Sequence, residues 1–96
     1  MEITEDELMG LVNSYSHLMI NYERYRNAIK HRTDKNVDEK FQEIVEENAK
    51  NDLFKSYSGY MKSFPKSIRM QLSCVTSVKR LLVREGLEDK VNELEN

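Results

Sequence analysis

The fold is decided by residues 8–29, which read LMGLVNSYSHLMINYERYRNAI. Apolar and aromatic side chains recur there at alternating steps of three and four, a spacing typical of one long amphipathic helix. The residues at these steps are Leu8, Leu11, Tyr15, Leu18, Tyr22, Tyr25 and Ile29. Val12 and Met19 beside this seam widen it beyond what a two-stranded coil needs, so we expect the rest of the chain to pack on it as a bundle.

The composition predicts a single all-α domain over residues 1–96. The chain has only three glycines, one proline and no tryptophan, and 33% of its residues are charged. A small sheet protein would need more turn residues than this. A chain of 96 residues suits one domain with a modest core. We therefore predict a small bundle of three main helices and a short C-terminal acidic helix.

Capping signals mark where the predicted helices begin. Thr4 with Glu7 three residues later, and Asn36 with Glu39, form two capping boxes. Pro65 suits the first turn of a third helix. Gly86 is expected to end that helix before the acidic tail. The main helices are accordingly predicted at about 4–32, 37–63 and 65–85.

The second predicted helix contains a weak segment near its middle. Residues 48–52 are poor helix formers, and Asp52 could cap a fresh helix there. Apolar residues nevertheless keep a spacing of four across this segment, so we favour one continuous helix, bent in the middle. The residues in step are Val45, Ala49, Leu53, Tyr57 and Met61, and Val37, Phe41 and Ile44 are expected to share an apolar face with Val45.

Charge is distributed in blocks of alternating sign, although the net charge of the chain is only −2. Residues 1–20 carry −4, residues 21–35 carry +3 and residues 36–53 carry −4. Residues 54–84 contain seven cations and no acid, and residues 85–96 return −4. Such blocks indicate either charged partners or helices of opposite charge lying side by side.

The basic block suggests a phosphate-binding face on the third helix. Cations interleaved with hydroxyl groups are what a nucleic-acid backbone requires. The alternative is internal pairing of this block with the acidic second helix and the acidic tail. A helix-turn-helix motif does not fit, because Pro65 would fall inside the recognition helix. The candidate phosphate-binding residues are Lys62, Lys66, Arg69, Ser73, Thr76, Arg80 and Arg84.

A second, thinner apolar stripe runs along the first helix away from the seam. Met9, Ser16 and Ile20 form this stripe, and a monomeric bundle would leave it exposed to water. We therefore predict a partner-binding surface there, used by another protein or by a second copy of the chain in a homo-oligomer.

The residues predict neither an enzyme nor a cofactor or metal site. His17 and His31 lie roughly 21 Å apart along one helix and are expected at the surface. Glycine-rich phosphate loops, CxxC pairs and HExxH motifs are missing from the sequence. The glutamates at 39, 43, 46 and 47 are expected to form a solvated helix face, because a calcium site needs converging loop oxygens. No small-molecule substrate is indicated.

The chain is expected to be a soluble cytoplasmic protein. Its N-terminus is acidic where a targeting peptide would be basic, and no apolar run approaches the length of a membrane span. The lone Cys74 is typical of a reducing compartment. The sequence thus predicts a small helical interaction module, such as an adaptor, regulator or inhibitor, with a nucleic-acid-binding accessory protein as the alternative.

Overall fold

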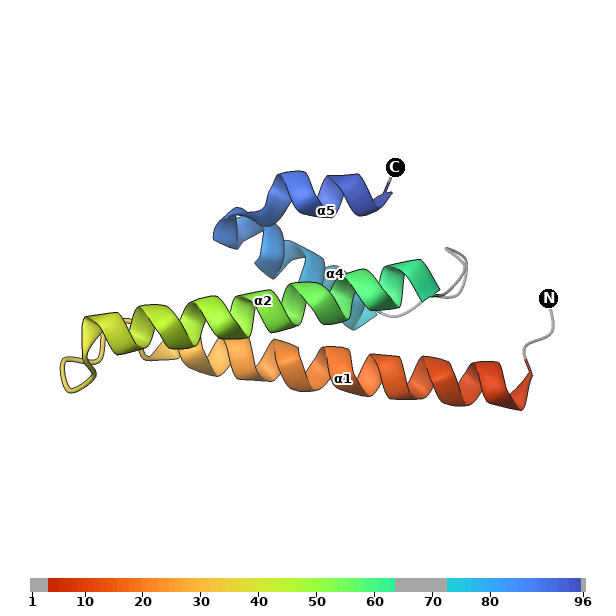
Figure 1. Cartoon of the computed structure of the whole chain (residues 1–96), viewed down its shortest axis with the longest axis horizontal. Helices are drawn as coiled ribbons and strands as arrows, with labels where there is room; N and C mark the ends of the chain where they lie inside the picture. Colours follow the sequence, from red (N-terminus) through yellow and green to blue (C-terminus); the bar gives the residue numbers. More distant parts are fainter. Residues whose placement is uncertain (1–3, 64–72, 96) are drawn as a thin grey trace.

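The computed structural model describes residues 4–63 and 73–95 and confirms the predicted all-α bundle. The elements are α1 (Glu5–Lys30), α2 (Glu39–Ser63), α4 (Ser73–Leu82), the π-helical turn η1 (Val83–Leu87) and α5 (Glu88–Glu95). α1 and α2 form a long antiparallel hairpin, and α4 and α5 lie on one side of it (Figure 1). The predicted helix start at Pro65 lies outside the described residues.

Both ends of α1 follow from local hydrogen bonding. The Thr4 hydroxyl accepts a hydrogen bond from the backbone N–H of Glu7 at 3.2 Å, as the capping box predicts. At the other end the backbone N–H groups of His31 and Arg32 donate to carbonyls only three residues back, at 3.2 and 3.1 Å. This tightening ends the helix at Lys30, two residues before the predicted boundary, and leaves Arg32 in the loop.

The predicted cap of α2 is wrong by two residues. The Asp38 carboxylate, rather than Asn36, accepts a hydrogen bond from the first turn of the helix, from the backbone N–H of Lys40 at 3.0 Å. Asn36 instead donates its own backbone N–H to the Asp34 carboxylate at 3.0 Å and belongs to the loop. A carboxylate also suits the positive end of the helix dipole better than a neutral amide does.

α2 runs without interruption to Ser63, as the spacing of its apolar residues predicts. Ser56 lies in its second half and joins the two arms of the hairpin, because its hydroxyl accepts a hydrogen bond from the amide of Asn21. The same hydroxyl donates to the backbone carbonyl of Asp52 at 3.0 Å. The apolar residues predicted to stay in step are buried at positions 49, 53, 57 and 61 and half-buried at position 45.

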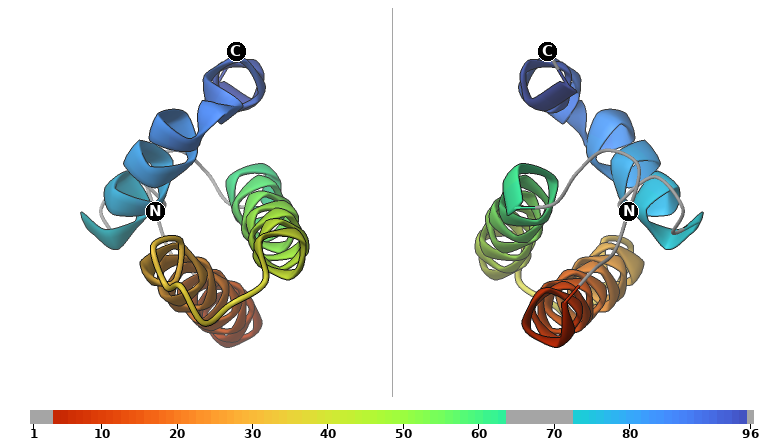
Figure 2. Two further views of the ribbon diagram at one scale, coloured as in Figure 1. Left: turned by 90° about the vertical axis from the view of Figure 1, so that its left-hand side faces the viewer. Right: turned by 90° about the vertical axis from the view of Figure 1, so that its right-hand side faces the viewer.

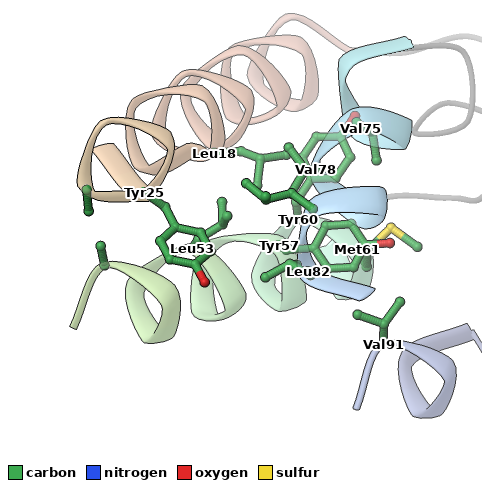
Figure 3. Packing of buried hydrophobic residues seen from close by; sticks show 13 residues of the cluster. Leu18, Tyr25, Leu53, Tyr57, Tyr60, Met61, Val75, Val78, Leu82 and Val91 are labelled. Carbon is green, nitrogen blue, oxygen red and sulfur yellow. The ribbon is translucent and has the colours of Figure 1, made fainter. Parts of the chain in front are cut away.

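The core lies where α4 and α5 close over the hairpin. Figure 3 shows Leu18 of α1, Leu53 of α2 and Val78 of α4 directed into one cluster. Seen along the hairpin, α4 lies on the α1 side, while α5 stands above α2 (Figure 2). The largest fully buried side chains are Tyr25, Tyr57, Tyr60, Leu18, Leu53, Leu82, Val78 and Val91.

Gly86 reverses the chain between α4 and α5. Its φ of 96° lies in the left-handed region that glycine adopts without strain. α5 then returns along α4 and buries Val91 completely, so the predicted end of the basic helix and the short acidic helix after it are both confirmed. Val75, Val78, Leu81 and Leu82 form the buried face of α4.

The beginning of α2 is not covered by the C-terminal helices. α4 and α5 lie over the later turns of α2 and do not reach its first turns (Figure 1). Phe41 and Ile44 therefore remain exposed, although the sequence places them on an apolar face. Helical spacing identifies a face correctly, but burial also needs a neighbouring element opposite it.

Candidate functional surfaces

The first candidate surface is a flank of α1 that no described helix covers. Leu8, Met9, Val12 and Ile20 are 47%, 60%, 49% and 65% exposed, and Ser16 is exposed among them. At 100° per residue these five side chains occupy about a third of the helix circumference. We call these five residues the α1 flank. The structure places the predicted Met9, Ser16 and Ile20 together on it.

The α1 flank belongs to a stretch without formal charge. Residues 8–22 contain no Asp, Glu, Lys or Arg, although a third of the whole chain is charged. The N-terminal turns of α1 also run past the last turn of α2 (Figure 1). Leu8 was predicted in the buried seam and is instead half-exposed at this projecting end. The missing charge between residues 8 and 22 was the signal that could have identified the whole flank.

The second candidate surface is the basic face of α4. Thr76, Arg80 and Arg84 are exposed and line a shallow hollow together with Lys79 and Val83. Lys62 is exposed at the end of α2. Of the other predicted phosphate-binding residues, Lys66 and Arg69 lie outside the described residues, and so does the side chain of Ser73, the first residue of α4.

Acidic residues of α5 reach this basic face. The Glu95 carboxylate forms an ion pair with the ammonium group of Lys79. Glu88 and Asn92 line the other side of the hollow that holds Arg80 and Arg84. The tail therefore lies beside the cations, as the predicted internal pairing requires. Lys79 is thus already paired, while Arg80 and Arg84 face the single carboxylate of Glu88 across the hollow itself, so its charge is only partly balanced.

An ion-pair cluster ties the loop end of the hairpin to the C-terminal helices. The Arg32 guanidinium donates to the Glu46 carboxylate at 2.5 Å and to the Glu85 carboxylate at 3.0 Å. The two carboxylates are only 17% and 15% exposed, so they gain more from this pairing than exposed acids would. These hydrogen bonds also raise the pKa of Arg32 above its ordinary value.

Tyr25 lies beside this cluster with its ring buried in the core. Burial raises the pKa of its phenol to about 12, and the negative charge of Glu85 adds to that effect. The hydroxyl therefore remains protonated at neutral pH. Sequence spacing found Tyr25 as a core residue, but nothing in it indicated that Arg32, Glu46 and Glu85 meet next to the ring.

The two histidines lie on exposed parts of α1 and of the loop that follows it. His17 and His31 are both exposed, as predicted. The nearest acid to His31 is Asp34, with 3.8 Å between the imidazole nitrogen and the carboxylate. Within residues 4–63 and 73–95, no three metal-ligating side chains cluster closely enough to hold an ion. None of the described helices is long and apolar enough to cross a membrane.

No protein-family model, no curated protein and no solved structure matches the chain.

Proposed function

We propose that the protein is a small non-enzymatic interaction module that presents the α1 flank to a protein partner. The observation that carries the proposal is the exposure of Met9 and Ile20 within an uncharged stretch of a long helix. Apolar side chains exposed in a row on one helix suit a partner that accepts an amphipathic helix in a groove. An adaptor, a regulator or an inhibitor would work in this way.

The packing behind the flank supports this role. Leu18 and Tyr25 anchor the opposite side of α1 in the core, and the Arg24 guanidinium pairs with the Asp52 carboxylate of α2 at 2.9 Å. The helix is thus held in shape before a partner arrives, which lowers the entropy lost on binding. A lone cysteine fits a reducing compartment, so we place the module in the cytoplasm.

Capture of partners from an extract of the source cells tests the proposal. The wild type, Ile20→Glu and the control Asn48→Glu are each immobilised, and the captured proteins are compared with and without nuclease. Asn48 is exposed on α2, and its substitution adds the same single negative charge. We expect a nuclease-resistant partner that Ile20→Glu loses at least tenfold and that Asn48→Glu retains. Equal capture by all three proteins would contradict a role for the α1 flank.

The hollow on α4 favours nucleic-acid binding as the second candidate function. Arg80, Arg84 and the Thr76 hydroxyl offer cations and a donor within one face, which suits phosphate contacts without reading of base sequence. We expect the affinity for duplex DNA to fall with salt at a log–log slope near −0.9 for each phosphate neutralised. The double substitution Arg80→Glu and Arg84→Glu should abolish binding.

Removing acidic groups of the tail tests nucleic-acid binding by α4 more sharply. Truncation after Glu85 would also remove Val91, which is completely buried, so the shortened chain would lose part of its core. Replacing Glu88 and Glu95 by glutamine removes the acids and keeps α5 in place. We expect this variant to bind nucleic acid more tightly than the wild type at low salt, because both acids lie within a Debye length of the cations. Undetectable binding by both proteins would exclude nucleic-acid binding, and the interaction module would be the remaining proposal.

A further inference from the structure

We propose that the occupant of the α1 flank is a second copy of the chain, with the two α1 helices antiparallel across a two-fold axis near residues 13–16. This inference rests on the proposed function, because it uses the same surface and names its partner. Three features of α1 support it: the exposed apolar side chains, the opposite charges at the two ends of the flank, and the small residues near its centre.

The charges on either side of the flank are complementary to one another. Residues 5–7 carry three acids, whereas residues 23–32 carry four cations against Glu23 alone. An antiparallel copy places each acidic end beside the basic end of the other helix, and a parallel copy would place like charges together. Arg26 and Lys30 are exposed on this basic end. Arg24 and Arg32 already pair with acids elsewhere in their own chain, and Arg26 pairs with Glu23 of the same helix at 3.3 Å. Lys30 therefore supplies the attraction, together with Arg26 once it exchanges Glu23 for an acid of the copy.

An antiparallel register brings the most exposed apolar residues together. If Met9 lies opposite Ile20 of the copy, the two-fold axis produces this contact twice, and residues paired across the axis have numbers that sum to about 29. Glu5 then lies within about one helical turn of Arg26 of the copy. Asn13 and Ser16 face each other next to the axis, where small side chains let the helices approach closely.

The size of the surface predicts a weak dimer. The apolar segment from residue 9 to residue 20 is roughly 18 Å long at 1.5 Å per residue. A single pair of helices of that length buries less than the roughly 1,200–2,000 Å² of a stable interface. We therefore expect a dissociation constant on the order of 10–100 µM. Association should be visible near 1 mM protein and lost at low micromolar concentration.

Sedimentation equilibrium of the full chain from about 10 µM to 1 mM tests the pairing. The wild type should pass from monomer to dimer over this range, as should the control Asn48→Glu. Ile20→Glu and, independently, Met9→Glu should raise the dissociation constant at least tenfold. Both substituted residues are exposed, so circular dichroism of the variants should match that of the wild type.

Disulfide trapping tests the orientation of the two helices. Chains carrying Met9→Cys and chains carrying Ile20→Cys, both with Cys74→Ser, are mixed in equal amounts and oxidised. An antiparallel pair should give mostly the mixed dimer between the two variants. Random pairing would give half mixed dimer, and a parallel pair would favour dimers of each variant with itself. Either of these two results would overturn the proposed geometry.

The outcomes separate this inference from the proposed function. A wild type that stays monomeric at 1 mM overturns the self-pairing. If such a monomer still captures a protein that Ile20→Glu loses, the interaction module stands with a foreign partner. A monomer that captures nothing through the α1 flank removes both proposals together.

Discussion

The two halves of α1 carry the same apolar repeat, yet they differ in what surrounds them. In the C-terminal half, Tyr25 is buried between α2 and the ion-pair cluster at Arg32. In the N-terminal half, Leu8 and Val12 are half-exposed, and the first turns of this half run past the end of α2 (Figure 1). One half therefore supports the bundle, while the apolar side chains of the other half stay exposed.

Truncation of one leucine in each half of α1 should give the largest difference in the free energy of unfolding. Leu18→Ala removes a completely buried side chain and should lower the free energy of unfolding by about 3 kcal/mol, because it leaves a cavity among three helices. Leu8→Ala removes a half-exposed side chain and should cost less than about 1 kcal/mol. Urea denaturation of dilute protein measures both. Equal losses would mean that the N-terminal half is covered as well.

Substitutions in the ion-pair cluster at Arg32 should give the next largest difference in the free energy of unfolding. Arg32→Gln leaves two mostly buried carboxylates without their cation, and we expect it to destabilise the fold by about 1–2 kcal/mol. Arg24→Gln is the matched control, because the ion pair of Arg24 with Asp52 is well exposed. That substitution should cost about 0.5 kcal/mol or less. If the two losses are the same, the cluster does not hold the C-terminal helices in place.

Substitutions in the loop between α1 and α2 should have a smaller effect on stability and test the cap of α2 independently. Asp38→Ala removes the carboxylate that caps α2 and should cost about 1 kcal/mol in the free energy of unfolding. Asn36→Ala should change it by less than about 0.5 kcal/mol, because only the backbone of Asn36 takes part in the loop hydrogen bonds. Thermal unfolding of both variants measures the difference. The reverse order would restore Asn36 as the cap.

Ionisation of Tyr25 should leave the free energy of unfolding unchanged at neutral pH and lower it in alkali. The folded protein keeps the phenol proton up to a pKa of about 12, whereas the unfolded chain loses it near pH 10. Between these values the folded state binds more protons, so its stability falls as the pH rises. Tyr25→Phe should lack this part of the decline. Urea midpoints of both proteins from pH 8 to 11 measure it, and parallel curves would contradict the raised pKa.

Local signals in the sequence determined the helices and most of their boundaries. The hydroxyl of Thr4 and the backbone freedom of Gly86 act within a few residues of their own positions, so a pattern of neighbours is enough to locate them. The stripe at Met9, Ser16 and Ile20 was predictable for the same reason, since helical spacing assigns each side chain to a face.

Tertiary structure alone decided which faces became buried and which charges met. Leu11 and Leu18 are one heptad apart and occupy equivalent positions in the repeat, but Leu11 is only partly buried, whereas Leu18 is completely buried where the other helices converge. The charge blocks predicted that some helices would attract one another, but Arg32 reaches Glu85 across 53 positions of sequence. Periodicity records the direction of a side chain on its own helix. Burial and ion pairing depend on a second element at contact distance, and only the folded chain supplies its position.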